Sequence, residues 1–248
     1  MTGRVAVAGI SHAFGPRSVL DGVGFDVAPG GLIALIGPTG CGKSTLLRVL
    51  AGLVVPGAGS ASVDGDSTLG RPGRCAYMPQ GDTLLAWRRA RDNATLGAQI
   101  AGYDLTAARE RATTLFARFG LSGFEESWPR QLSGGMRQRV ALLRTVMSDQ
   151  PVLLLDEPFA ALDAITRTDL QGWLSQLLQA EQRTTLLVTH DVDEALRLAD
   201  QVIVLSARPG RIVDRITLSA ARPRTVLQIT DEDFAIVKRQ VLAALTRR

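Results

Sequence analysis

Short apolar runs recur along the chain, and segments with helical periodicity separate many of them. Several runs are continuously apolar, which is typical of strands that helices cover on both faces of a sheet. The expected strands cover residues 5–10, 23–27, 32–36, 75–78, 152–155, 186–189 and 202–205. Helical patterns follow Lys43, Ser133 and Asp191, and another spans residues 166–179. This alternation predicts an α/β fold whose sheet is at least partly parallel.

Two regions depart from the alternation. Residues from about 84 to 147 have a mostly helical pattern with no strong strand, so we expect a helical subdomain inserted into the α/β core. Near the C-terminus, Pro209 and Gly210 separate two apolar runs, which predicts a final hairpin. A closing helix is expected over residues 231–248, so the hairpin and helix together take up about residues 201–248. The whole chain of 248 residues is long enough for one sizeable domain.

No apolar run approaches the ~20 residues that a membrane-spanning helix needs. The N-terminal residues do not have the pattern of a secretory signal. Cys41 and Cys75 are too few for a disulfide scaffold and lack metal-ligand spacing. We therefore expect a cytoplasmic protein with reduced cysteines.

The formal net charge is +4, and the basic excess lies in the C-terminal part of the chain. From Ala207 to the end there are nine Lys/Arg and four Asp/Glu, against 19 and 20 before it. We interpret this excess as a solvated face, with a polyanion site or contact with anionic lipid as alternatives. Only two of the 28 basic residues are lysines, Lys43 and Lys238. This usage suggests that position 43 needs a compact ammonium rather than a planar guanidinium.

The most specific motif directly follows the expected strand 32–36 and reads Gly37-Pro38-Thr39-Gly40-Cys41-Gly42-Lys43-Ser44. It is the phosphate-binding loop pattern, with four residues between the first glycine and Gly-Lys-Ser. The glycines let backbone N–H groups wrap an anion, and a following helix N-terminus adds partial positive charge. We expect Lys43 to reach the outer phosphates of a nucleotide and the Ser44 hydroxyl to bind Mg²⁺. An accidental glycine-rich turn would match this pattern too rarely to explain it.

Two further strands are expected to end in polar residues. The run 152–155 leads into Asp156 and Glu157, and a buried strand ending in carboxylates is costly unless a cation or a water needs them. Asp156 suits Mg²⁺, and Glu157 suits a general base that accepts a proton from the attacking water; a solvated strand end is the alternative. His190 ends the run 186–189, where a structural role is the alternative to contact with the γ-phosphate or the attacking water. Ligands of open α/β sheets bind at the carboxyl ends of strands, so Gly37, Asp156 and His190 are expected to converge.

A second helix start with anion-binding character is formed by Ser133, Gly134 and Gly135. Since the chain already has a phosphate loop, this segment raises the question of whose phosphate it would hold. Ordinary helix capping explains the same residues equally well, and spacing alone does not choose between the two interpretations.

Together and in this order, the segments resemble the ATP-binding-cassette (ABC) family over essentially the whole chain. Residues 37–44 are similar to its Walker A loop, Asp156 and Glu157 to its Walker B and catalytic glutamate, and residues 132–138 to its signature sequence. The resemblance implies a P-loop NTPase (RecA-like) core with an inserted helical subdomain and an N-terminal β subdomain. It also implies an ATP hydrolase that uses Mg²⁺ and is coupled to transmembrane transport.

The resemblance assigns roles to more residues. Gln80 looks like the Q-loop glutamine, which in the family touches Mg²⁺ and senses the membrane subunit, and residues 161–163 resemble the D-loop. His190 resembles the switch histidine, Phe14 falls where an aromatic ring stacks on adenine, and Thr45 is counted with the nucleotide-binding loop. Because family members pair head to tail, residues 133–135 are expected to cover ATP held by a second copy of the chain. ATP would then close a homodimer, and hydrolysis would reopen it.

Finer features resemble the nitrate, sulfonate, taurine and thiamine-precursor importers of bacteria. They are Leu84-Leu85-Ala86-Trp87, Asp92-Asn93, residues 159–167 and 206–212, and Arg222-Pro223-Arg224. Ala86 departs from the usual Pro, and Leu143-Arg144-Thr145 departs from Ala-Arg-Ala. The subgroup implies a subunit peripheral on the inner face of the membrane, with a separate permease, an extracytoplasmic solute-binding protein and no nucleic acid. Gln80 and residues 84–91 are the expected permease contact, where Trp87 is either part of the contact or part of the core.

Other classes explain less of the sequence. An exporter ATPase has the same motifs and is the nearest alternative. A nucleic-acid-associated cassette usually has two cassettes or a long coiled coil, whereas this chain has one cassette and no sustained heptads. A small-molecule kinase would leave the Ser133 segment and the pair Asp156 and Glu157 unexplained. A GTPase would require an Asn-Lys-x-Asp motif, which the sequence lacks.

Overall fold

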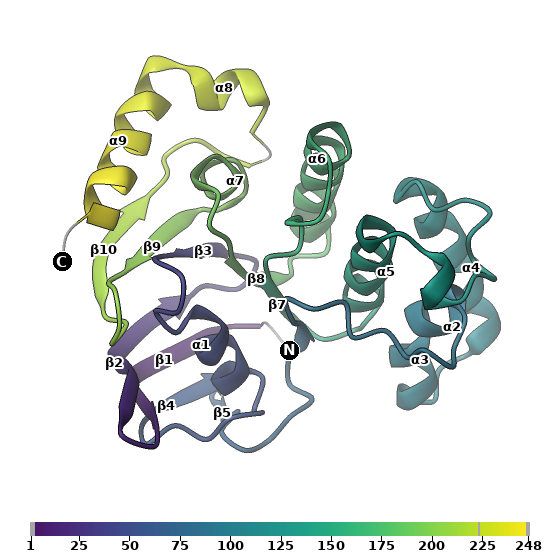
Figure 1. Ribbon diagram of the computed structural model, residues 1–248, viewed down its shortest axis with the longest axis horizontal. Helices are drawn as coiled ribbons and strands as arrows, with labels where there is room; N and C mark the ends of the chain where they lie inside the picture. The colour runs from purple at the N-terminus through teal and green to yellow at the C-terminus, as the bar shows by residue number, and fades with distance from the viewer. Residues whose placement is uncertain (1–2, 223, 247–248) are drawn as a thin grey trace.

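A six-stranded sheet forms the centre of the computed structural model, which describes residues 3–222 and 224–246 (Figure 1). Its strand order is β10-β9-β3-β8-β7-β6, and all neighbouring strands are parallel except the pair β9 and β10. The strands are β3 (Leu32–Ile36), β6 (Ala76–Met78), β7 (Val152–Asp156), β8 (Thr184–Val188), β9 (Gln201–Leu205) and β10 (Ile212–Thr217). The expected partly parallel α/β sheet is therefore confirmed.

Alternate residues of the central strands face two separate hydrophobic cores. In β3, Ile33 and Leu35 pack toward one core, whereas Ala34 and Ile36 pack toward the other. The first core is completed by the N-terminal strands and α1, and the second by α5, α6, α7 and α9. Because each strand is covered on both faces, every residue of β3, β7 and β8 is buried. This burial explains why the sequences of these strands are mostly apolar, and β3 is apolar throughout.

A second, antiparallel sheet has the order β2-β1-β4-β5 and lies beside α1 (Figure 1). Its strands are β1 (Val5–Phe14), β2 (Arg17–Val27), β4 (Ala58–Val63) and β5 (Asp66–Ser67). The N-terminal β subdomain was expected, but no strand was predicted at β4 or β5. The sequence of β4 consists mostly of Ala, Gly and Ser, so it lacks the β-branched and aromatic residues that indicate a strand.

Between β6 and β7 the described chain forms helices and loops without a strand, and Figure 1 shows these helices to one side of the sheet. The helices of the whole described chain are α1 (Lys43–Leu50), α2 (Ala90–Ala94), α3 (Leu96–Ala101), α4 (Leu105–Arg118), η1 (Pro129–Gln131), α5 (Gly134–Val146), α6 (Ala164–Ala180), α7 (Val192–Leu198), α8 (Val226–Thr230) and α9 (Glu232–Thr246). The expected helices after Lys43, Ser133 and Asp191 are confirmed, whereas the division into a core and a subdomain over residues 84–147 stays a prediction. No described helix combines the length and apolar character needed to cross a bilayer.

The expected C-terminal hairpin is formed by β9 and β10, and the closing helix is α9. Residues 247 and 248 of the expected helix, and Pro223 of the Arg222-Pro223-Arg224 sequence, lie outside the described residues. The short helix α8 was not predicted. Fully buried Val241 and Ala244 attach α9 to the second core.

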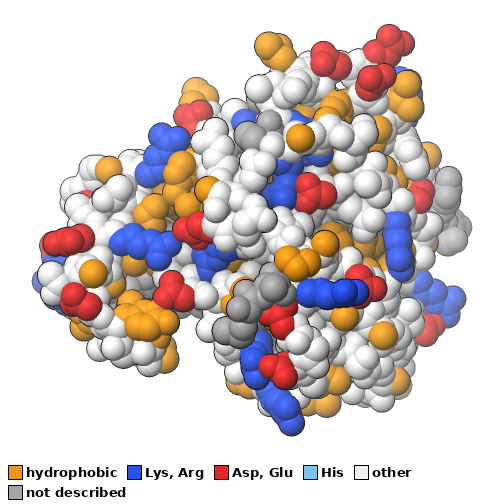
Figure 2. Space-filling view, turned by 180° about the vertical axis from the view of Figure 1, so that it is seen from behind, with side chains coloured by type: hydrophobic (Ala, Val, Ile, Leu, Met, Phe, Trp, Pro, Cys, Tyr) orange, Lys and Arg blue, Asp and Glu red, His pale blue; other side chains and the backbone are white. Residues whose placement is uncertain are grey.

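Several basic residues of the C-terminal part bind groups of the core. Arg222 Nε donates to Asp200 Oδ1 at 2.7 Å, and Lys238 Nζ pairs with Asp193 Oδ1 at 2.6 Å. Buried Arg224 donates to the carbonyl oxygen of Ala199 at 2.6 Å. On the face shown in Figure 2, Lys/Arg and Asp/Glu side chains are interspersed. Part of the basic excess therefore fixes the C-terminal segment in place and is not the purely solvated face that the sequence suggested.

The turn between β9 and β10 joins the two sheets. Gly210 N donates to Val19 O at 2.9 Å, and Asp21 N donates to Gly210 O at 3.1 Å, which ties the turn to β2. A Cβ atom at Gly210 would lie 2.2 Å from the carbonyl oxygen of Cys41 in the loop between β3 and α1. Only glycine permits this approach of the turn to that loop.

We predict that Gly210→Ala lowers the melting temperature, because the new methyl group would force apart two backbone segments. Overpacking of this kind costs about 1–3 kcal/mol, which corresponds to a shift of roughly 2–12 °C in a domain of this size. Thermal unfolding of Gly97→Ala serves as the control, since the nearest atom to a Cβ there is 3.8 Å away. Equal melting temperatures for the two variants would contradict the prediction.

Candidate functional site

Residues 37–42 connect β3 to α1 and form a tight loop. Gly40 and Gly42 have positive φ angles of 76° and 109°, which are unfavourable for other residues. A Cβ atom at Gly42 would lie 2.7 Å from Leu20 Cδ2, and one at Gly37 would lie 2.9 Å from Leu205 O. The spacing of glycines in the motif thus follows from backbone conformation and from close packing against neighbouring strands.

Lys43 begins α1, and its side chain folds back over the loop. Its Nζ donates to the carbonyl oxygens of Gly37 at 2.6 Å and Pro38 at 3.0 Å, and the residue is 8% exposed. Both acceptors are neutral, and the ammonium group lies at the positive end of a helix. The arrangement favours an anion above the loop.

Asp156 ends β7 beside the start of α1. It is 2% exposed, and this burial raises the pKa of its carboxyl group, whereas a hydrogen bond with the Ser44 hydroxyl opposes the rise. A nearby cation would favour the ionised carboxylate. Hydroxyl and carboxylate oxygens are the ligands that Mg²⁺ prefers, and Gln80, just after β6, adds an amide oxygen near the same site. Clusters of three or more His, Cys, Asp or Glu that would suggest another metal site do not occur among the described residues.

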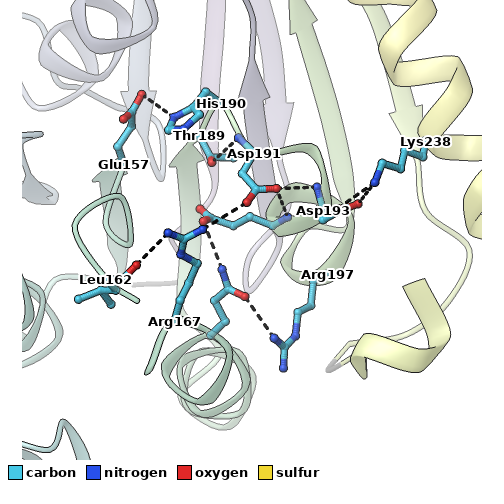
Figure 3. A network of polar contacts seen from close by, with 11 residues as sticks. Glu157, Leu162, Arg167, Thr189, His190, Asp191, Asp193, Arg197 and Lys238 are labelled. Carbon is cyan, nitrogen blue, oxygen red and sulfur yellow. Dashed lines mark hydrogen bonds and ion pairs between the residues drawn. The ribbon is translucent and has the colours of Figure 1, made fainter. Parts of the chain in front are cut away.

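Glu157 follows Asp156 in a strained conformation, with a φ of 51°. Its N–H donates to Val188 O at 2.9 Å, and its carbonyl accepts from Gln138 Nε2 of α5 at 3.2 Å. Its side chain turns toward His190, whose Nδ1 lies 3.3 Å from Glu157 Oε1 (Figure 3). The carboxylate and the imidazole therefore form a pair, as expected if the ends of β7 and β8 converge.

These groups surround one cavity of about 690 Å³. Ten residues predicted for the site line it: Phe14, Thr39, Gly40, Gly42, Lys43, Ser44, Thr45, Gln80, Glu157 and His190. The predicted residues Gly37, Pro38, Cys41 and Asp156 are not part of this lining; the first three belong to the loop, and Asp156 ends β7. Phe14 is 53% exposed at the edge of the cavity and contacts His12 edge to face, with ring centroids 4.5 Å apart.

Ser133, Gly134 and Gly135 do not line this cavity. Ser133 Oγ accepts a hydrogen bond from Met136 N at 3.2 Å and so caps α5, as one of the two interpretations expected. A Cβ atom at Gly135 would lie 3.0 Å from Ala161 O, so this glycine allows α5 to approach the loop after Glu157. Within one chain, capping is therefore the role that this segment performs.

Sequence reasoning missed two cationic residues of the cavity, Arg17 and Arg208. Arg208 Nε donates to Gly40 O at 3.1 Å from the turn after β9, 168 positions along the chain. The segment 206–212 was noted as a subgroup feature, but nothing local indicated that its arginine reaches the phosphate loop. With Lys43, the two arginines give the cavity three cationic side chains.

A buried carboxyl group lies behind the pair of Glu157 and His190. Glu194 in α7 is 6% exposed; its Oε2 accepts from Gln171 Nε2 at 3.2 Å, and its Oε1 has no partner in the described part of the chain. Arg197 donates to Gln171 Oε1 at 3.2 Å, which fixes the orientation of the Gln171 amide. Burial, together with the charge of Asp191, raises the pKa of Glu194 to about 8.

The chain is similar to known proteins over most of its length. A family model described as ABC transporter matches residues 20–160. An uncharacterized ABC transporter ATP-binding protein of Methanocaldococcus jannaschii is 42% identical over 91% of this chain and 86% of that protein. The aliphatic sulfonates import ATP-binding protein SsuB 3 of Nocardia farcinica is 43% identical over 98% of this chain and 92% of that protein.

Solved structures agree with this similarity. The dimeric structure of MJ0796, described as a bacterial ABC transporter cassette, superposes with a TM-score of 0.80 at 26% identity. The superposition covers 88% of this chain and 100% of the MJ0796 chain. A post-hydrolysis state of the same cassette bound to ADP and Pi gives a TM-score of 0.78 with the same coverage.

We predict that Glu194 makes the folded protein less stable as the pH rises. Between pH 4.5, the ordinary pKa of the group, and about pH 8, the folded protein keeps this proton whereas the unfolded chain loses it. The stabilising contribution of Glu194 is therefore full below pH 4.5 and is lost as the pH rises to about 8. Between pH 5 and pH 8.5, the melting temperature of the wild type should therefore fall by at least about 3 °C more than that of Glu194→Gln. Parallel curves for the two proteins would show that Glu194 titrates normally.

Proposed function

The chain belongs to the ABC transporter family, and from that membership we propose that it is the ATP-hydrolysing subunit of a solute importer. It binds ATP and couples ATP hydrolysis to transport, as members of this family do. The convergence of the phosphate loop, Asp156, and the pair of Glu157 and His190 at one cavity is the observation that carries the proposal. Relatives that cover almost the whole chain are named as import ATP-binding proteins for aliphatic sulfonates, which favours the importer over the exporter.

Nucleotide binding is assigned to the cavity and its loop. The ammonium of Lys43 and the N–H groups of residues 37–45 would bind the phosphates, and exposed Phe14 would stack on the adenine. The guanidinium groups of Arg17 and Arg208 add positive charge to the same cavity. Three cations against the single carboxylate of Glu157 in the lining suit a polyanion such as ATP.

The oxygen groups of Ser44, Asp156 and Gln80 fit Mg²⁺ and would hold it next to the phosphates. When bound, Mg²⁺ supplies charge neutralisation for the β- and γ-phosphates. Burial raises the pKa of the Asp156 carboxyl, and such a cation would favour its ionised form.

Hydrolysis requires a group that accepts a proton from the attacking water. Glu157 faces the cavity, and its Oε1 is held 3.3 Å from His190 Nδ1. We assign Glu157 as the general base that takes this proton as the water oxygen attacks the γ-phosphorus. His190 orients the carboxylate through Nδ1, while its position in the cavity wall also allows contact with the γ-phosphate.

The segment 133–135 is assigned to the ATP of a second copy. It does not line its own cavity, and the related cassette MJ0796 forms a dimer. Head-to-tail pairing would place this helix start over the phosphates of the other subunit, and charge neutralisation from both sides would close the dimer. Hydrolysis removes that favourable interaction and lets the dimer open.

The partner in the membrane is a separate permease, and the subunit would lie on the inner face of the membrane, with an extracytoplasmic solute-binding protein on the other side. Gln80 and residues 84–91 are the proposed contact. Trp87 is 73% exposed there, so it is not part of the hydrophobic core, which was one of its two expected roles. An exposed ring of this size suits an interface. No observation favours a nucleic acid.

We predict that Glu157→Gln binds ATP with unchanged affinity but lowers turnover by at least ~100-fold, the usual contribution of a general base. The variant should also accumulate as an ATP-bound dimer, because closure no longer ends in hydrolysis. Phosphate release and size-exclusion chromatography measure the two effects. Glu181→Gln is the control, because Glu181 pairs with Arg111 and Arg183 and does not line the nucleotide cavity, so its turnover should equal that of the wild type. Wild-type turnover in Glu157→Gln would refute the assignment.

Pairing across the dimer predicts complementation between two inactive variants. Ser133→Arg disables the capping segment and Lys43→Ala disables the phosphate loop, so each homodimer should be inactive. In an equal mixture about half of the dimers would be mixed, each with one intact site, which restores roughly a quarter of wild-type turnover. If tagged chains prove that mixed dimers form and turnover stays absent, the segment does not act on the ATP of the other copy.

A further inference from the structure

Arg167 joins the two loops that carry Glu157 and His190, on the side away from the cavity. It lies in the first turn of α6, where Nη2 donates to Leu162 O at 2.9 Å in the loop after Glu157. Its Nη1 lies 3.7 Å from Asp191 Oδ2, in the loop after β8 (Figure 3). One guanidinium group therefore bridges the segments that follow β7 and β8.

Asp191 uses its two carboxylate oxygens for different partners. Oδ1 accepts from the N–H groups of Asp193 at 2.9 Å and Glu194 at 3.2 Å, and so caps α7. Oδ2 faces Arg167. Asp191 N also donates to Thr189 Oγ1 at 3.0 Å, so both neighbours of His190 are fixed. Asp191, the residue after His190, is therefore held by both α7 and Arg167.

The imidazole of the pair has little support from packing. The His190 side chain is 67% exposed, and its contact with Glu157 at 3.3 Å is long for a charge-assisted hydrogen bond. Glu157 has a positive φ angle, a conformation that persists only where the surroundings impose it. Contacts behind the pair, which we call the brace, would therefore hold Glu157 and His190 in place where their own contact does not.

The brace has a polar interior. A cavity of about 30 Å³ is lined by Glu157, His190, Arg167 and Glu194, among others. Arg167 Nε and Glu194 Oε1 are buried atoms without a partner in the described residues. A space of this size suits one water molecule, which would accept a hydrogen bond from Arg167 and bond to Glu194. Such a bridge would extend the brace from α6 into α7.

We propose that Arg167 is a positioning residue for ATP hydrolysis, which holds the pair of Glu157 and His190 by bracing Leu162 O against the Asp191 carboxylate. This inference rests on the proposed function of that pair. Arg167 does not line the nucleotide cavity, so its effect falls on the rate of the chemical step and not on ATP affinity. Nothing in this role requires contact between Arg167 and the nucleotide.

Two variants separate this role from simple loss of stability. Arg167→Ala removes both contacts, whereas Asp191→Asn keeps an oxygen to cap α7 and removes only the charge that faces Arg167. We expect Arg167→Ala to lower kcat by about 10- to 100-fold, since a misplacement of about 1 Å can cost ~100-fold, with the ATP dissociation constant unchanged. Asp191→Asn should lower kcat less, and the double variant should be no slower than Arg167→Ala, because both act through one contact.

Arg197→Ala is the matched control. Arg197 also links α6 to α7, through Gln171 Oε1 at 3.2 Å, and it donates to Arg224 O at 3.3 Å, but it contacts neither catalytic loop. Its loss should lower the melting temperature and leave kcat unchanged. If Arg197→Ala lowers kcat as much as Arg167→Ala at equal folded fraction, the effect is general loosening and the proposal is wrong.

A second measurement needs no ATP. The chain has only two histidines, His12 and His190, so the imidazole signals in NMR spectra can be assigned by the loss of one set in His190→Gln. We expect Arg167→Ala to shift and broaden the His190 signals while His12 stays unchanged, and Arg197→Ala to change neither. Unchanged His190 signals in Arg167→Ala would overturn the positioning role alone. Wild-type kcat in Arg167→Ala, with Glu157→Gln inactive, would do the same. Full turnover in Glu157→Gln would instead remove the function on which it rests.

Discussion

The register of the parallel sheet brings the ends of β3, β7 and β8 to one edge. Val188 of β8 pairs with Leu35 of β3 and with Asp156 of β7, so the three strands end at the same level. The phosphate loop, the pair of carboxylates and His190 all follow these ends. Because a one-residue slip in any strand would move its side chains to the other face of the sheet, the site depends on this register.

Charged side chains at this edge are held in constrained positions. Lys43 is bound by carbonyl oxygens, and Asp156 is buried beside the Ser44 hydroxyl. Glu157 is held with a positive φ angle. Burial makes the charged forms of Lys43 and Asp156 costly on their own. In the proposed function, a polyanion and a divalent cation would offset that cost.

The site is also supported from behind by segments distant in sequence. The turn after β9 presses Gly210 against the phosphate loop, and Arg208 from the same turn binds Gly40. On the other side, Arg167 and Asp191 join the loops after β7 and β8, and Lys238 of α9 pairs with Asp193 at the start of α7. The C-terminal segment, which carries much of the basic excess, is thereby part of the scaffold of the site.

The sequence by itself determined the central strands, the phosphate loop and the residues at the strand ends. Periodicity and glycine spacing are local properties, and residues 32–36 were predicted with the bounds that β3 has. Only the tertiary structure placed Arg17 and Arg208 in the cavity, put Trp87 on the surface and set Ser133 apart from its own phosphate loop. It also decided that the small, polar residues of β4 form a strand, because pairing with β1 supplies what their side chains do not. The physical reason is that these outcomes depend on contacts between residues far apart in the chain, as between Arg208 and Gly40, which local patterns do not encode.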